Sequence, residues 1–144
     1  MSTEESKAML RRVAEEIFNK GNLAVADELI ASNYVYHLPG QPDIHGPEGF
    51  KQMVTMYRTA FPDFHMTVDD MVAEGDKVVH HLTIRGTHQG DFMGVAPTGK
   101  QVTMPVLTVS RFAGGKEVEA SSFTDTLGVL QQMGVAPPVG QGGK

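Results

Sequence analysis

The sequence contains no cysteine among its 144 residues. Disulfide bonds, thiolate nucleophiles and thiolate metal ligands are therefore excluded, and the absence fits a reducing compartment. Basic residues are also few, since 12 lysines and arginines stand against 17 aspartates and glutamates, for a net charge of −5. Because they are scattered rather than clustered, we expect no nucleic acid as a partner.

Long apolar runs are absent as well. No run approaches the roughly 18 residues that a membrane-spanning helix needs. The start of the chain, Met1–Glu5, is acidic and polar, unlike a secretory signal. We therefore expect a cytoplasmic protein with no membrane association. Glycine motifs for nucleotide phosphates and the Gly-x-Ser-x-Gly elbow of serine hydrolases are also missing, so we expect no cofactor and no serine hydrolysis.

Six histidines raise the question of a metal site. The sequence has no His-x-His motif, no His-Glu-x-x-His motif and no histidine with a carboxylate at the spacing of a facial triad. Asp69 and Asp70 are adjacent, but neighbouring residues of a strand point to opposite faces and cannot act on one atom. We therefore expect no metal.

The N-terminal part of the chain has helical periodicity. Ser2 and Glu5 have the spacing of a capping box, and apolar residues then recur at helical intervals until Gly21. Asn22 can cap a second, shorter helix whose apolar face includes Ile30. A short strand is predicted over Tyr34–Leu38, and a third helix is predicted to open at Gly46-Pro47 and to end at Pro62.

From Phe64 onward the sequence is rich in Val, Thr, Ile and Phe, which is typical of strands. Two glycine-containing turns, at Gly75-Asp76 and Gly114-Gly115, predict hairpins. The predicted strands are Phe64–Glu74, Lys77–Thr87, Gln101–Ala113 and Lys116–Thr124, followed by a short helix over Thr126–Met133. Helices first and a meandering sheet afterwards indicate an α+β fold. We expect one domain over residues 1–136 and a flexible tail over residues 137–144.

A glycine-rich segment, Gly86–Lys100, joins two of the predicted strands and carries His88. Its glycines permit backbone angles that other residues resist, so such a segment can rim a cavity. Together with Ala60-Phe61-Pro62-Asp63 and Asp125-Thr126-Leu127-Gly128, it resembles the SnoaL-like polyketide cyclase (ester cyclase) family, over about Leu10 to Gly134. The resemblance implies a cone-shaped α+β barrel of the nuclear-transport-factor-two-like superfamily, in which a curved, mostly antiparallel sheet wraps around the N-terminal helices.

The resemblance also implies an activity, the closure of a polyketide ring by cofactor-independent intramolecular aldol condensation. Asp125 matches the aspartate that serves as acid and base in the family, and His88 would stabilise the developing enolate as a neutral donor. Each residue has a second interpretation. An aspartate directly before a helix is a common N-cap, and a loop histidine can bond its own glycine-rich backbone.

Further residues are expected to bind the substrate. His80 shares one face of its strand with Val78 and Leu82, although a core histidine bonded to a neighbouring hydroxyl would have the same pattern. In the family fold the segment with His37 reaches the cavity. Methionines suit an adaptable lining for a flat, apolar ligand, or ordinary core filling. The remaining residues expected at the substrate site are Phe50, Met53, Tyr57, Phe92 and Met104.

Two alternative functions remain open. One is a non-catalytic binding module for a hydrophobic metabolite, and the other is a related cofactor-free hydroxylase, hydrolase or isomerase on the same fold. In every case the partner is a hydrophobic small molecule. The open face of the sheet, with Val79, His81 and Thr83, would gain from burial in a two-fold homodimer.

Overall fold

The computed structural model describes residues 1–137, and most of the predicted C-terminal tail lies outside this range. The helical elements are α1 (Thr3–Arg12), the π-helix η1 (Val13–Asn19), α2 (Val25–Leu29), α3 (Gly46–Ala60) and α4 (Thr126–Gln132). The strands are β1 (Ile30–His37), β2 (Ile44–His45), β3 (His65–Glu74), β4 (Lys77–Thr87), β5 (Gln101–Ala113) and β6 (Lys116–Thr124). No helix in the described range is long and apolar enough to cross a membrane.

The predicted capping box begins α1. The Ser2 hydroxyl accepts a hydrogen bond from the Glu5 amide at 3.0 Å, and the Ser2 amide donates to the Glu5 carboxylate at 2.9 Å. The helix continues directly into η1, whose wider turns bury Ile17 and Phe18. These apolar residues form the helical side of the core.

Several details of the N-terminal half differ from the sequence prediction. Asn22 does not cap the second helix, since α2 follows Ala24 with no side-chain cap, and the strand predicted over Tyr34–Leu38 spans Ile30–His37. Ile30 belongs to β1 rather than to the second helix, because α2 ends at Leu29 and the backbone of Ile30 is already extended. The short strand β2 was not predicted, since its two residues are too few to show a period of two. From Gly46 onward, the predicted elements agree with the structure to within two residues at each end.

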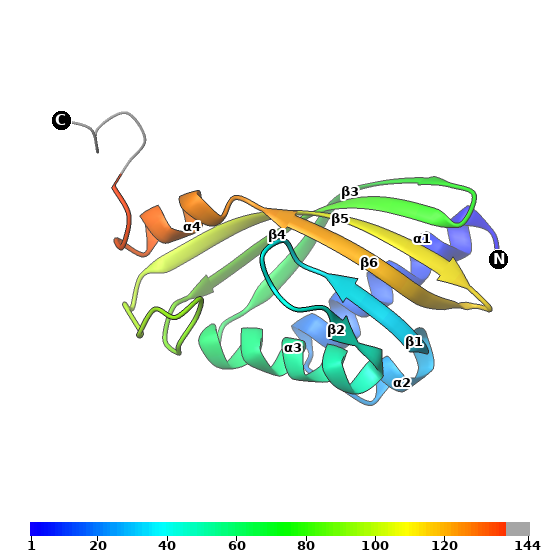
Figure 1. Ribbon diagram of the computed structural model, residues 1–144, viewed down its shortest axis with the longest axis horizontal. Helices are drawn as coiled ribbons and strands as arrows, with labels where there is room; N and C mark the ends of the chain where they lie inside the picture. Colours follow the sequence, from blue (N-terminus) through cyan, green and yellow to red (C-terminus); the bar gives the residue numbers. More distant parts are fainter. Residues whose placement is uncertain (138–144) are drawn as a thin grey trace.

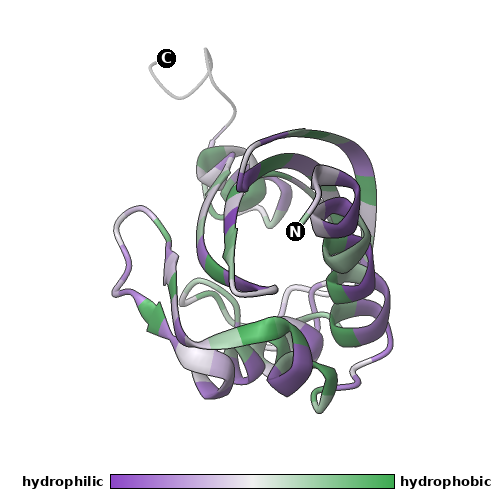
Figure 2. Ribbon diagram, turned by 90° about the vertical axis from the view of Figure 1, so that its right-hand side faces the viewer, coloured by the Kyte–Doolittle hydropathy of each residue, from purple (hydrophilic) through white to green (hydrophobic). Residues whose placement is uncertain are grey.

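The strands form one sheet in the order β2-β1-β6-β5-β4-β3. All neighbours pair antiparallel except β1 and β6, which run parallel. The sheet does not close on itself. It curves strongly, and the helices cover its concave side, with α3 running beneath it (Figures 1 and 2). The result is the α+β cone that the resemblance implied.

The glycine-rich segment Gly86–Lys100 is fastened to the end of α3. The amides of Gln89 and Gly90 both donate to the Ala60 carbonyl, at 2.9 and 3.0 Å. Gly90 lies so close to α3 that a Cβ atom there would come within 2.5 Å of the Thr59 carbonyl oxygen. At the tip, Met93 adopts a left-handed conformation (φ 53°) in the turn between Phe92 and Val95.

We predict that Gly90→Ala lowers the free energy of unfolding by about 2 kcal/mol, because the added methyl group meets rigid backbone and must push the segment off α3. Urea denaturation measures the effect. Gln89→Ala is the control in the same segment, since its exposed side chain can be shortened while its backbone amide still donates to Ala60, and it should change stability by less than about 0.5 kcal/mol. Equal losses in the two variants would contradict this account.

Candidate functional site

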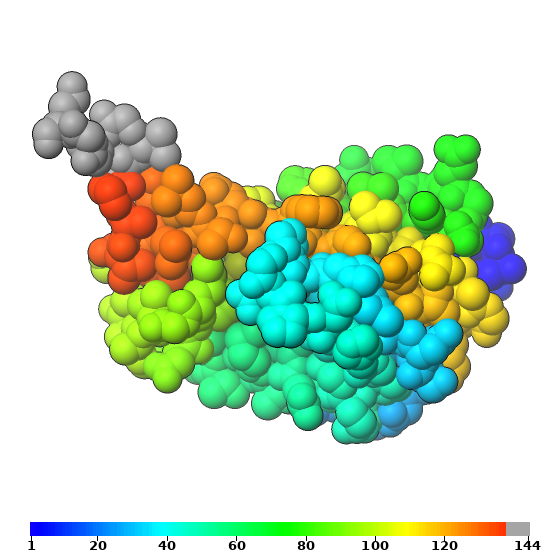
Figure 3. Space-filling model, in the orientation of Figure 1, coloured from blue at the N-terminus to red at the C-terminus, as the bar shows by residue number. Residues whose placement is uncertain are grey.

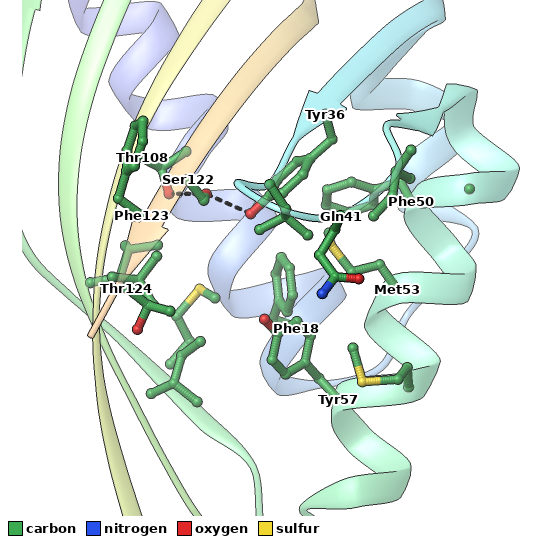
Figure 4. A pocket seen from close by; sticks show the side chains of 18 of the residues that line it. Phe18, Tyr36, Gln41, Phe50, Met53, Tyr57, Thr108, Ser122, Phe123 and Thr124 are labelled. Atoms are coloured by element: carbon green, nitrogen blue, oxygen red, sulfur yellow. Dashed lines mark hydrogen bonds between the residues drawn. The ribbon is translucent and has the colours of Figure 1, made fainter. Parts of the chain in front are cut away.

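A cavity of about 1040 Å³ lies between the concave face of the sheet and the helices. Its walls are mainly apolar, with Phe18 from η1 and with Phe50, Met53 and Tyr57 from α3 facing the sheet (Figure 4). The lining also includes exposed residues of the segment Leu38–Asp43, which lies between β6 and α3 on the molecular surface (Figure 3). The cavity therefore opens beside this segment and is large enough for a drug-sized ligand.

A row of polar side chains runs along the sheet wall of this cavity. Alternation along β5 turns Thr108 and Ser110 inward, and Ser122 lies opposite Thr108 on β6. The Tyr36 hydroxyl donates to Ser122 Oγ at 2.5 Å, and the Ser122 and Thr108 hydroxyls lie 2.6 Å apart (Figure 4). The row thus links three strands through neutral hydroxyl groups.

Two titratable side chains lie at the inner end of this row. His80 Nε2 lies 2.9 Å from Ser110 Oγ, and both His80 and Glu117 line the cavity. Burial raises the pKa of Glu117 to about 7, although the Ser110 hydroxyl acts in the opposite direction. Burial lowers the pKa of His80 to about 4, so its imidazole is neutral near pH 7. A buried carboxyl group that exchanges its proton near neutral pH is suited to acid–base chemistry.

Sequence reasoning missed Glu117 because of a bulge. Inward-facing Ala120 and Ser122 would, by strict alternation, place Val118 inside and Glu117 outside. The pairing of β5 with β6 shifts register between Arg111 and Phe112, and Glu117 and Val118 are both buried as a result. A β-bulge inserts one residue and reverses which side chains face inward. No local sequence signal marks this position.

The structure places most of the expected substrate-site residues in the cavity wall. His80 is buried on the inner face of β4, as the alternation of that strand predicted. The others in the lining are Phe50, Met53, Tyr57, Phe92 and Met104. Their contact with a substrate stays a prediction.

Asp125 does not lie where the family resemblance placed it. Its side chain is exposed and is not among the residues that line the 1040 Å³ cavity. One carboxylate oxygen accepts a hydrogen bond from the Gly128 amide at 2.9 Å, which makes Asp125 the N-cap of α4. It adjoins a shallow depression of about 380 Å³ near His81 and Leu107. The geometry corresponds to the capping alternative.

His88 is also separated from the cavity. It is fully buried against Phe61, and its Nδ1 accepts from the Thr98 amide at 3.3 Å, with the Thr98 hydroxyl 2.9 Å away. This arrangement leaves the hydrogen on Nε2, which has no partner among the described residues. His88 thus holds the glycine-rich segment in place through Thr98, while Phe92 and Met93 of the same segment line the cavity.

His37 points away from the cavity, which corrects the expectation for this residue. Tyr34 and Tyr36 occupy the inward positions of β1, so alternation turns His37 outward. Its ring bridges Glu119 of β6 at 2.8 Å and Asp43 at 2.9 Å. These two carboxylates, Glu119 first, raise the pKa of His37. The bridge ties the segment at the cavity opening to the sheet.

Within residues 1–137, no three His, Asp or Glu side chains gather in a way that could hold a metal ion.

The fold is an open, curved sheet covered by helices, with an apolar cavity under its concave face. These features define the class of cone-shaped α+β folds that bind ligands or carry enzyme sites. The family profile described as SnoaL-like polyketide cyclase matches residues 8–133, so the chain belongs to this family. It is 28% identical over 137 residues to aklanonic acid methyl ester cyclase of Streptomyces peucetius, covering 93% of this chain and 94% of that protein. It is also 28% identical to nogalonic acid methyl ester cyclase of Streptomyces nogalater, covering 87% and 95%.

Solved structures agree with this assignment. IdmH of Streptomyces antibioticus is 36% identical, with a TM-score of 0.76 over 90% of this chain and 98% of that chain. A SnoaL-like protein of Jannaschia sp. CCS1 is 26% identical and superimposes with a TM-score of 0.85, over 94% and 95% of the two chains.

The burial of Glu117 leads to a prediction about stability and pH. In the unfolded chain this carboxyl ionises near its ordinary value of 4.5, whereas in the folded protein it keeps its proton to about pH 7. Stability is therefore lost as the pH rises between these values, by up to about 3 kcal/mol. Glu117→Gln removes this loss, so its stability relative to the wild type should increase from pH 5 to pH 7.5 in urea denaturation.

His80 contributes with the opposite sign, since its depressed pKa makes stability rise between about pH 4 and 6.5, but it does so in both proteins and cancels in the comparison. Glu119→Gln is the matched control. The pKa of Glu119 is lowered by hydrogen bonds from His37 and Arg111, so this change should destabilise the protein above pH 4.5. A pH-independent difference for Glu117→Gln would refute the assignment.

The capping role of Asp125 gives a second prediction. Asp125→Ala should lower the free energy of unfolding by about 1 kcal/mol, because the Gly128 amide loses its acceptor. Asp125→Asn should stay close to the wild type, since asparagine caps helices about as well as aspartate. The measurement is urea denaturation followed by circular dichroism, and equal stability of the alanine variant would show that the cap is dispensable.

Proposed function

We propose that the protein closes a ring in an apolar, carbonyl-bearing polyketide by intramolecular aldol condensation inside the 1040 Å³ cavity. The observation that carries this proposal is a buried carboxyl group, Glu117, in the wall of an apolar cavity in a chain of the SnoaL-like cyclase family. A water-poor cavity of this kind favours proton transfer from carbon, because water does not solvate the base and compete with the substrate for it.

The proposed reaction uses Glu117 as both base and acid. Its carboxylate takes the proton from a carbon between two carbonyl groups, and the resulting carbanion bonds to a second carbonyl carbon of the same molecule. The electron pair of that C=O bond moves to its oxygen, which then receives the proton back from Glu117. The product is an isomer of the substrate, and the enzyme is regenerated. A pKa of about 7 lets Glu117 serve in both steps.

Asp125 remains the competing candidate for the base, because it matches the family pattern. Its exposure and its bond to Gly128 argue against it, since a solvated carboxylate outside the cavity cannot reach a substrate held within. His80 is a positioning residue in this scheme. Its neutral ring holds the Ser110 hydroxyl, the group that lowers the pKa of Glu117 against the effect of burial.

The test measures conversion of aklanonic acid methyl ester and nogalonic acid methyl ester, chosen after the two curated relatives, to products of unchanged mass. Glu117→Gln should lower kcat by at least about 100-fold, as expected for loss of a general base. Asp125→Asn and the control Glu119→Gln should keep kcat within about threefold. Loss of turnover in Asp125→Asn with full activity in Glu117→Gln would reassign the base to Asp125.

One observation favours a second function, a binding module without turnover. The carboxylate that the family pattern offers for catalysis is engaged as a helix cap. Tight binding of both esters with no product from the wild-type protein would establish this alternative.

The outer face of the sheet suits a homodimer. Leu107 and Phe123 lie opposite each other on β5 and β6 and are about half exposed, and Val79 is exposed on β4. Burial of these apolar side chains against a second copy would remove them from water.

A further inference from the structure

Three hydroxyl groups form a chain in the sheet wall of the cavity. Tyr36, Ser122 and Thr108, here termed the hydroxyl chain, come from β1, β6 and β5 and all line the cavity. The consecutive oxygen–oxygen distances are 2.5 and 2.6 Å. Thr108 and Ser122 are almost completely buried. The chain therefore holds its three oxygen atoms in fixed positions away from bulk water.

Proton counting shows that the hydroxyl chain is incomplete. Three hydroxyl groups carry three hydrogens, but two bonds use only two of them. Tyr36 donates to Ser122, and either Ser122 or Thr108 donates in the second bond. One hydrogen is left on Ser122 or Thr108 in each case, and within residues 1–137 the side chains of these two residues make no further hydrogen bond. A buried donor without an acceptor is costly unless a ligand supplies one.

The surroundings keep the hydroxyl chain a donor. Burial raises the pKa of Tyr36 well above its ordinary value, so the phenol stays protonated. Across the cavity lie the apolar side chains of Phe18, Phe50 and Met53, together with Gln41 (Figure 4). No hydrogen bond joins the Gln41 amide to the hydroxyl chain. His80 lies beside Thr108 in the sheet, but its Nε2 is engaged by Ser110. The missing acceptor must therefore come from the occupant of the cavity.

We propose that the hydroxyl chain binds a carbonyl oxygen of the substrate, the one beside the carbon that Glu117 deprotonates, which gains negative charge as the carbanion forms. This inference rests on the proposed function and extends it by assigning a second polar contact. Neutral donors fixed in an apolar site stabilise such a charge without having to reorient. Thr108 and Ser110 are two residues apart on one strand, so the hydroxyl chain lies about 7 Å from the Glu117 end of the row. The substrate class is thus an apolar ketone long enough to span both positions.

The test compares binding of 2-acetylnaphthalene with that of 2-ethylnaphthalene, which has the same shape but no carbonyl group. The triple variant Tyr36→Phe/Thr108→Val/Ser122→Ala removes the three hydroxyls together, so no donor or acceptor of the chain is stranded. The ratio of ketone affinity to hydrocarbon affinity should fall about fivefold relative to the wild type, the equivalent of one net hydrogen bond. Affinity for 2-ethylnaphthalene should be retained.

The infrared carbonyl band of ¹³C-labelled 2-acetylnaphthalene gives a readout that needs no variant. In the wild-type complex the band should lie at lower frequency than in cyclohexane, and Ser121→Ala, on the same strand but the opposite face, should not change it. Thr108→Val should keep the shift, because Ser122 then ends the chain with a free hydrogen. An unshifted band in the wild type, or an affinity ratio unchanged in the triple variant, overturns the proposal.

The two proposals can fail separately. A shifted carbonyl band in a protein that converts neither ester would retain the hydroxyl chain as a ketone-binding site and remove the cyclase. Turnover with an unshifted band would do the reverse. If neither naphthalene compound binds, the cavity is not a ligand site and both proposals fall.

Discussion

The site depends on one constraint, that polar groups inside an apolar cone must find partners there. Thr108, Ser110 and Ser122 face inward because alternation along β5 and β6 turns them away from water. Each finds a partner on a neighbouring strand: Thr108 bonds to Ser122, Ser122 to Tyr36 of β1, and Ser110 to His80 of β4. In a medium of low dielectric constant such bonds are strong when complete and expensive when broken. The same bonds that hold four strands in register therefore also decide which polar atoms remain for a ligand.

The cavity stays open because the helices meet the sheet through large aromatic side chains. Phe50 of α3 packs edge-on against Tyr34 of β1 and against Phe18 of η1, and Tyr57 packs against Phe92 of the glycine-rich segment. These rings fix the distance between α3 and the sheet, while the hydrogen bonds from Gln89 and Gly90 to Ala60 fix the glycine-rich segment to the end of α3. The walls are thus held apart by a frame of packed rings around an apolar space, and the polar row is confined to one side of it.

Local patterns predicted most of the fold. The capping box at Ser2, the proline that follows Gly46 and the two glycine turns each act within a few residues, so the sequence reveals them directly. The family resemblance supplied the cone, which no local pattern contains. The site was harder to predict. Asp125 has two interpretations that only its surroundings separate, and the inward position of Glu117 depends on a register shift between two strands. For His37, alternation along the strand predicts the observed outward orientation, whereas the position implied by the family resemblance does not.

The parallel pairing of β1 with β6 has a consequence for the order of folding. Tyr36 and Ser122 are 86 residues apart, whereas the hairpins from β3 to β6 join strands that follow one another along the chain. Closing the long loop between β1 and β6 costs more conformational entropy than closing a hairpin, and this cost comes before the stabilising contacts form. The four-stranded meander is therefore expected to assemble first and β1 to dock last. A growing polypeptide consequently has no complete ligand chamber until β6 has been synthesised.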